Sequence, residues 1–580
     1  MPFRRTRTVR PWVAALLCIA VLGSLAPVPA LRASGADNFR ALKKQWDKSE
    51  SQTLTERLPI LEEIGRCEDP AAGQFLSKLF AHDDDPESES ALHTTLIWIL
   101  VQRGDAAATE ALVSNAFRVL NPNSWRLVDQ AFEAHPPKPE GQEWLLERGY
   151  KLVPGLEAYP QKIVLAALEG TGDARAGEAA KSLLGNRKIQ PSVQAVLVEL
   201  IRKHRIEGAT KKISKLYRVH DADLQVAVLR ALRDFEATEH SKTFRKGLES
   251  RFWQVRVTAV DIFGGTMDPE VVPDLIPMLE DSFSQVQIAA VRALRKIGGR
   301  GVIQPLIDAL EEAPGRVRDD IADTLLWLTG EDLGPEHLAW SSWWAQHGES
   351  ATVKEITREE FEKRRAEAAK STTGTYYGLR VISEFVTFVV DVSGSMNEPY
   401  FVTEPDSDES GRRKRGTGVD EKDDEKEEAA KNRVQKQKIQ VAREELARAV
   451  RGMRLGTEFN IIAFDAVINP WHEGLIELDE EVRSDALAYI ESLAPGGTTN
   501  IFDTLLRALE DESVNTIFFL SDGAPTAGSV QAPDEILRRV RQLNEIRKVK
   551  IHTIGFHLDP VATDLMRRLA EENHGTFVER

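Results

Sequence analysis

Apolar residues recur at helical spacing between about residue 55 and residue 330, with almost none of the alternation expected of strands. Two positions of this pattern repeat every 31 residues. The first is occupied in turn by Val193, Leu224, Val255, Val286 and Val317. The second is occupied by Ile213, Phe244, Leu275 and Leu306. Because two registers agree on one period, the pattern predicts paired helices that stack on their neighbours as a solenoid.

This all-α region resembles the HEAT-repeat family in a short variety. The resemblance rests on VVPDLIPMLED (271–281) followed by VQIAAVRALRKIG (286–298), and on GVIQPLIDALEEA (301–313) followed by VRDDIADTLLWL (317–328). Such a solenoid either presents a protein-binding surface or spaces another domain, and the sequence leaves both interpretations open. Trp340, Trp343 and Trp344 share one helix face and are expected to cap its exposed apolar end.

From about residue 377 the pattern changes to strands that alternate with amphipathic helices, which is typical of a parallel α/β sheet. We expect strands at 384–391, 459–464, 516–522 and 551–556. The predicted organisation is a signal peptide (1–30), the HEAT-like solenoid with its cap (31–345), a charged helical linker (346–376) and an α/β domain (377–580).

Polar residues cluster where these strands end or helices begin, at 391–395, 496–500 and 521–523. Ligands bind outside the carboxyl ends of parallel strands, so the clusters are expected to meet there. They offer carboxylate and hydroxyl oxygens without cysteine or histidine, which suits Mg²⁺ or Mn²⁺. Two carboxylates balance the charge of one ion, so a partner's carboxylate could complete its shell.

The sequences DVSGSM (391–396), GGTTN (496–500) and LSDG (520–523) resemble the metal-binding motifs of the von Willebrand factor A family. The resemblance implies a Rossmann-like doubly wound sheet that holds one divalent ion. The implied ligands are Asp391, Ser393, Ser395, Thr499 and Asp522. Thr498 stays an alternative to Thr499 because the threonine is doubled.

The family's first helix usually follows the first motif closely, but here residues 397–430 intervene. This insertion holds 12 acidic and 6 basic residues and little apolar content, which predicts a mobile loop beside the metal face. It is either a lid that offers a carboxylate to the ion or a solvated insertion.

The N-terminus combines four arginines before residue 11 with an apolar run over 12–26 and a Val-x-Ala site ending at Ala30. This arrangement predicts a secretory signal peptide, or an uncleaved signal anchor, and a secreted or periplasmic protein without a further membrane span. The formal net charge of −16 argues against a nucleic-acid binder. Cys18 and Cys67 are too few for a zinc site or a disulfide framework.

No GxxxxGK[ST], HExxH or GxSxG motif is present. The sequence therefore favours an extracytoplasmic interaction protein over an enzyme, with a partner that supplies an acidic residue and a solenoid surface open to a second protein. Two alternatives remain. The first is a metal-dependent hydrolase that uses Asp391 and Asp522, and the second is an assembly factor for an ATPase machine.

Overall fold

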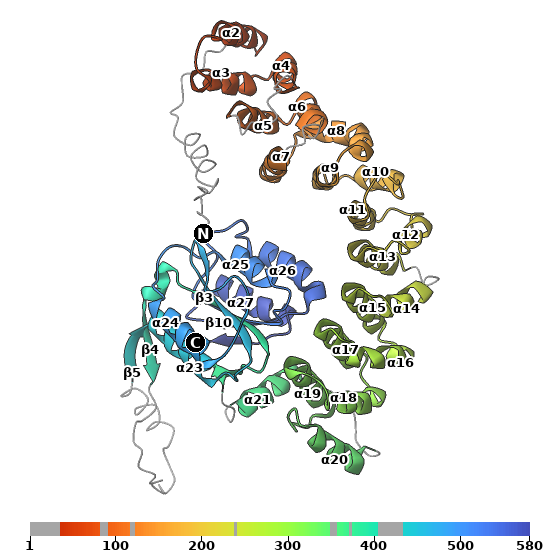
Figure 1. The fold of residues 1–580 in the computed structure, drawn as a ribbon, viewed down its shortest axis with the longest axis vertical. Coiled ribbons are helices and arrows are strands. Elements are labelled where there is room, and N and C mark those ends of the chain that lie inside the picture. The colour runs from red at the N-terminus through yellow and green to blue at the C-terminus, as the bar shows by residue number, and fades with distance from the viewer. Residues whose placement is uncertain are drawn as a thin grey trace, which may run out of the picture. The chain divides into compact units, whose positions relative to one another are not determined.

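The computed structural model describes residues 35–81, 91–116, 122–236, 241–348, 356–369, 374–403 and 433–580. The chain divides into two units, Met1–Leu216 and Tyr217–Arg580 (Figure 1). The expected signal peptide and most of the 397–430 insertion lie outside the described residues.

The described part of the first unit consists of helices joined by short connections. These are α2 (Gly35–Lys48), α3 (Leu54–Arg66), α4 (Pro70–Ala81), α5 (Ala91–Arg103), α6 (Ala106–Ala111), α7 (Pro122–Ala134), α8 (Pro139–Glu147), α9 (Ala158–Gly170), α10 (Arg175–Leu183), α11 (Pro191–Lys203) and α12 (Thr210–Leu216). Buried Arg103 at the end of α5 donates to the carboxylate of Asp105 and to the carbonyl oxygen of Gly65. None of the described helices is both long enough and apolar enough to cross a bilayer.

The 31-residue pattern begins with buried Val193 on α11 and buried Ile213 on α12 in the first unit, and it continues on regularly repeated helices of the second unit. Its first register lies on α13 (Ala222–Asp234), α15 (Trp253–Thr266), α17 (Ser284–Ile297) and α19 (Gly315–Thr329). Leu224, Val255, Val286 and Val317 are each at most 1% exposed. The alternate helices are α14 (Ser241–Leu248), α16 (Val272–Leu275) and α18 (Ile303–Ala309). The predicted period is thus the spacing at which successive helices bury the same face.

The tryptophan-rich segment forms α20 (His337–His347). Trp340 is fully buried, and its indole Nε1 donates to the carbonyl oxygen of Gly334 at 2.8 Å. Trp343 and Trp344 pack half-buried against the same apolar core. The tryptophans of α20 therefore cover apolar surface of the last described repeat.

The C-terminal domain is a mixed sheet with strand order β11-β10-β9-β3-β6-β7. The strands are β3 (Phe385–Asp391), β6 (Glu458–Phe464), β7 (Ile468–Pro470), β9 (Thr516–Ser521), β10 (Lys550–Gly555) and β11 (Phe577–Glu579). The five strands from β11 to β6 are parallel, whereas β7 and the short β8 (Ile476–Glu477) pair antiparallel with β6. The predicted parallel α/β fold is confirmed, with an antiparallel edge.

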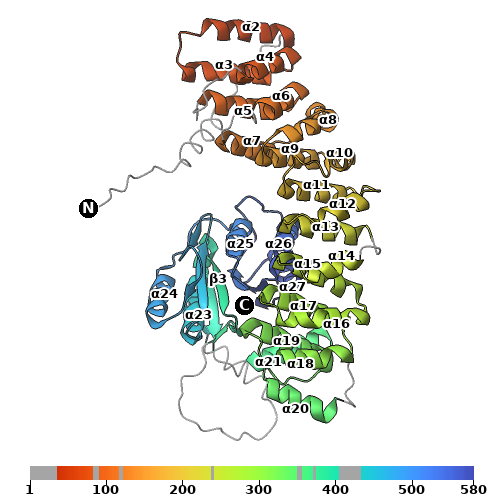
Figure 2. The same ribbon diagram turned by 45° about the vertical axis from the view of Figure 1, so that its right-hand side comes forward.

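Helices cover both faces of this sheet, as a doubly wound fold requires (Figure 2). One face packs against α23 (Lys438–Gly452) and α24 (Glu480–Ser492). The other packs against α25 (Ile501–Glu510), α26 (Pro533–Arg547) and α27 (Pro560–Glu572). A short hairpin of β1 (Thr375–Tyr376) and β2 (Leu379–Arg380) adds Tyr376 to the first of these cores.

A strand at the start of the insertion pairs with a strand that follows the insertion, which the sequence did not predict. β4 (Pro399–Thr403) and β5 (Arg433–Gln437) form an antiparallel two-stranded ribbon, in register from Pro399↔Gln437 to Thr403↔Arg433. The expectation of a loop throughout 397–430 is therefore wrong at its first residues. The pairing partner lies about thirty residues away in sequence, so no local pattern announces it.

The last repeat and the C-terminal domain meet through buried charged groups, which we call the ionic joint: Arg316, Asp319, Asp320 and Asp323 of α19, with Arg365, Arg380 and Lys550. The Arg316 guanidinium donates to the carbonyl oxygens of Asn515 and, at 2.7 Å, Lys548. The Lys550 ammonium donates to the carboxylate of Asp320. Burial would raise the pKa of Asp320, but Lys550 and Arg316 outweigh it and hold this pKa below its ordinary value.

The other two acidic groups of the joint are paired with arginines. Asp319 accepts from Arg380 at 2.8 Å and from Arg365 at 3.3 Å, and Asp323 accepts from Arg365. Arg365 belongs to α21 (Arg358–Ala369), so this helix of the expected linker is tied to the last repeat. The three clustered carboxylates resemble a cation site, but the surrounding basic groups already neutralise them.

The joint lies at the amino-terminal edge of the sheet. Asn515 immediately precedes β9, and Lys550 is the first residue of β10. The repeats therefore hold the domain by the edge opposite the carboxyl ends of its parallel strands.

We expect Lys550→Met to lower the free energy of unfolding by about 3 kcal/mol, because it leaves a buried carboxylate without its ammonium. Urea unfolding of the full chain, followed by tryptophan fluorescence, measures this loss. The matched control is Arg568→Met, which removes an exposed pair with Asp534 and should cost less than about 1 kcal/mol. Equal losses for the two variants would contradict a stabilising role for the joint.

Candidate metal centre

Three segments converge on a depression of about 380 Å³ at the carboxyl edge of the sheet. They are the turn after β3, the loop before α25 and the end of β9. Ser393, Ser395, Thr499 and Asp522 line the depression, as does Thr498. Asp391, the remaining residue of the set implied by the sequence motifs, is fully buried and hydrogen-bonded to Ser393.

The carboxylate of Asp391 is fixed by two donors. Its Oδ1 accepts from the backbone N–H of Ser393 at 2.8 Å, and its Oδ2 accepts from the Ser521 hydroxyl at 2.6 Å. Burial raises the pKa of Asp391 to about 6, against the opposing effect of the hydrogen bonds from Ser393 and Ser521. A buried carboxylate of this kind gains from a nearby cation that would compensate its charge.

A chain of hydroxyl groups connects the first motif to the third. Ser393 Oγ lies 3.1 Å from Ser395 Oγ, and the Ser395 hydroxyl donates to Asp522 Oδ1 at 2.7 Å. Each hydroxyl can rotate and offer a lone pair instead of its proton. The same side chains can therefore hold one another or turn their oxygens toward a cation.

The threonine loop is held against the first motif by its backbone. The N–H of Gly496 donates to the carbonyl oxygen of Val392 at 2.7 Å, and the N–H of Gly394 donates to that of Gly497 at 3.1 Å. Gly497 has φ +70°, and a Cβ there would lie 2.6 Å from the carboxylate of Asp465, so this position requires glycine. Thr499 is 5% exposed, whereas Thr498 is exposed.

Lys438 is a residue of the site that the sequence analysis missed. It is the first residue of α23 and is 4% exposed, and its ammonium donates to Asp522 Oδ2 at 3.0 Å and to Glu398 Oε2 at 2.8 Å. Burial would lower the pKa of Lys438, but the hydrogen bonds to Glu398 and Asp522 outweigh it and raise this pKa. A lysine opening a helix, where the dipole disfavours a cation, was the available signal.

Ser521 was also missed as a supporting residue, although it stands beside Asp522 in the LSDG motif. His552, expected to be structural, is buried on β10; its ring stacks on Phe518 with centroids 4.9 Å apart and accepts from the N–H of Thr576.

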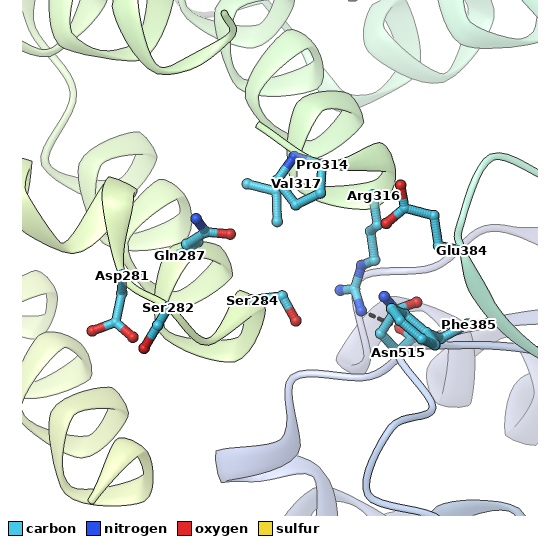
Figure 3. Close-up of a pocket in the computed structure, with 10 residues that line it drawn as sticks. All are labelled: Asp281, Ser282, Ser284, Gln287, Pro314, Arg316, Val317, Glu384, Phe385 and Asn515. Atoms are coloured by element: carbon cyan, nitrogen blue, oxygen red, sulfur yellow. Dashed lines mark hydrogen bonds between the residues drawn. The ribbon is translucent and has the colours of Figure 1, made fainter. Parts of the chain in front are cut away.

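A second, smaller pocket of about 270 Å³ lies between α17, α19 and the domain (Figure 3). Arg316 points across it to Asn515, and Glu384 accepts from the backbone N–H of Gly315. These polar groups already serve the joint, so the pocket belongs to the packing of α19 on the domain.

The oxygen-rich depression fits a hard divalent cation. Ser393, Ser395, Thr499 and Asp522 line it, and the buried carboxylate of Asp391 is hydrogen-bonded to the Ser393 N–H. These motif residues offer carboxylate and hydroxyl oxygens only, although His557 also lines the depression. The residues present therefore meet the chemical requirement of the ion that the motifs imply.

Two parts of the chain match known families. Residues 241–325 match HEAT repeats, and residues 429–578 match the von Willebrand factor type A domain. The latter match includes Thr499 and Asp522 but begins after Asp391, Ser393 and Ser395. The 397–430 insertion therefore separates the first motif from the matched part.

Human inter-alpha-trypsin inhibitor heavy chain H2 is 33% identical over 135 residues, which cover 21% of this chain and 14% of that protein. Human von Willebrand factor A domain-containing protein 3A is 30% identical over 121 residues, covering 20% of this chain and 10% of that protein. The matching region thus spans only a small part of either relative's length.

A solved von Willebrand factor type A protein from Catenulispora acidiphila is similar to 34% of this chain and 39% of its own, at 18% identity and a TM-score of 0.25. The HEAT-repeat match agrees with the regularly repeated helices, and the von Willebrand factor type A match agrees with the sheet topology. The chain carries HEAT repeats followed by a C-terminal von Willebrand factor type A domain.

Proposed function

We propose that this chain is an extracytoplasmic interaction protein that binds a partner through one divalent cation at the carboxyl edge of its von Willebrand factor type A domain. The observation that carries the proposal is the convergence of the three polar motifs, separated by up to 131 residues in sequence, on one oxygen-lined depression. An acidic side chain of the partner would complete the ion's shell.

In this proposal Asp391, Ser393, Ser395, Thr499 and Asp522 hold Mg²⁺ or Mn²⁺. Thr499 is preferred to Thr498 because it is buried directly before Asn500, the N-cap of α25, whereas Thr498 is exposed. The cation would compensate the charges of two carboxylates and present a coordination position to an outside oxygen. The chain's own residues would hold and orient the ion, and the serine hydroxyls, which now hydrogen-bond to each other and to Asp522, could turn their oxygens toward it.

A binding role is favoured over the hydrolase alternative because the described residues offer ligands for one cation, whereas hydrolytic sites commonly use two. Two-metal hydrolytic sites place two cations about 3.5–4 Å apart. The other clustered carboxylates of the described residues, Asp319, Asp320 and Asp323, each form an ion pair with arginine or lysine in the ionic joint. The HEAT repeats would hold the domain by its opposite edge, leaving the depression to a partner.

We expect Asp391→Asn to weaken Mn²⁺ binding at least about tenfold, because it removes a ligand charge while the side-chain shape is kept. Isothermal titration of the full chain measures the affinity. Asp534→Asn, at an exposed carboxylate on α26, is the matched control and should bind Mn²⁺ as the wild type does. Unchanged affinity in Asp391→Asn would contradict the proposed ligand set.

Partner binding should require the ion. A pull-down from the extracytoplasmic fraction with the wild-type chain should retain a protein with Mg²⁺ and lose it with EDTA, and Asp391→Asn should not retain it in either condition. A partner held equally by both baits in both conditions would place binding on the repeats and refute the metal-dependent role.

A further inference from the structure

We propose that Lys438 is a built-in counter-cation of the metal centre, which neutralises Asp522 and thereby sets how tightly the site takes a divalent ion. This inference rests on the proposed function, since it concerns the affinity of the same site. It assigns a role to a residue that lies outside the family's metal-binding motifs and contributes no ligand atom.

The placement of this lysine is unusual. Its side chain is 5% exposed, and it begins a helix, where the macrodipole and burial both disfavour a positive charge. Lys436, two residues earlier on β5, pairs instead with Glu444 at the surface, 2.9 Å away. The same segment thus contains one lysine at the surface and one drawn into the depression by two carboxylates.

The hydrogen-bond donors to Asp522 show how the Lys438 ammonium would compete with a divalent cation for this carboxylate. Ser395 donates to Oδ1 and Lys438 donates to Oδ2, so both oxygens of this carboxylate are engaged. The serine hydroxyl can turn and offer its own oxygen to a cation. The ammonium has three donors and no acceptor, so it stays a positive charge beside the ion. A divalent cation must therefore share Asp522 with Lys438 or displace it.

Glu398 gives Lys438 a second partner when Asp522 turns to the ion. Its carboxylate is 2.8 Å from the ammonium and its side chain is 62% exposed. It also precedes β4 directly, as Lys438 follows β5, and the Lys438 N–H donates to the Glu398 carbonyl oxygen at 3.0 Å. Glu398 and Lys438 therefore connect the two strands at the end of the ribbon nearest the depression. The Glu398 carboxylate also partly neutralises the lysine beside the candidate metal centre.

Two substitutions should move the affinity for the ion in opposite directions. Lys438→Met removes a positive charge close to the site and should tighten Mn²⁺ binding about tenfold or more. Glu398→Gln removes the carboxylate that neutralises Lys438 and should weaken binding by several-fold. A purely structural role for the pair would not give opposite signs, because either change breaks the same ion pair.

The test is isothermal titration of the full-length wild type, Lys438→Met and Glu398→Gln with Mn²⁺ in buffer freed of other divalent ions. Lys436→Met is the matched control, since it removes a lysine of the same ribbon and should leave the affinity unchanged. Circular dichroism melts of the metal-free proteins identify any variant that does not fold, and Lys438→Gln then replaces Lys438→Met.

Tighter binding by the Lys438 variant together with weaker binding by Glu398→Gln would support the proposal. Equal affinities of wild type and the Lys438 variant would overturn it and leave the metal site intact. Weaker binding by that variant would also overturn it, because Lys438 would then position Asp522 for the ion. If neither the wild type nor any variant bound Mn²⁺, the proposed function itself would fail and this inference with it.

Discussion

The ionic joint at the amino-terminal edge of the sheet is the constraint on which the C-terminal unit depends. Burying Arg316, Lys550 and Asp320 is tolerable only because each group meets a partner, so helix and sheet edge are held in one arrangement. Asp319 and Asp323 extend this pairing to Arg365 and Arg380 outside the repeats. With the last repeat held there, the carboxyl ends of the parallel strands stay open for binding.

At the carboxyl edge of the sheet, the acidic groups have different partners. Its carboxylates are held by hydroxyl and backbone donors that can be exchanged, and by one ammonium that cannot accept. The charges of the joint are paired with one another, whereas the buried carboxylate of Asp391 accepts from neutral donors among the described residues, Ser393 and Ser521. The two acidic clusters of this unit therefore differ in their partners: basic side chains pair with the carboxylates of the joint, and in the proposed function a cation would compensate those of the depression.

The sequence predicted a large part of this architecture because its main features are periodic or contiguous. The 31-residue register predicted the buried helix positions Leu224, Val255, Val286 and Val317. The apolar run before Asp391 predicted a strand that is covered on both faces. The three motifs could be expected to converge, because parallel strands bring their carboxyl ends to one edge. The ribbon, the joint and Lys438 were not predicted, since each depends on a partner distant in sequence.

Periodicity and short oxygen-rich motifs are local properties of the chain, so the sequence alone predicted helical repeats followed by an α/β domain and the polar motifs that gather at one edge of its sheet. The tertiary structure alone decided which charges neutralise which. Lys438 lies 84 residues from Asp522, and Lys550 lies 230 residues from Asp320. Such pairs form when packing removes both groups from water, because a buried charge without a partner costs too much free energy.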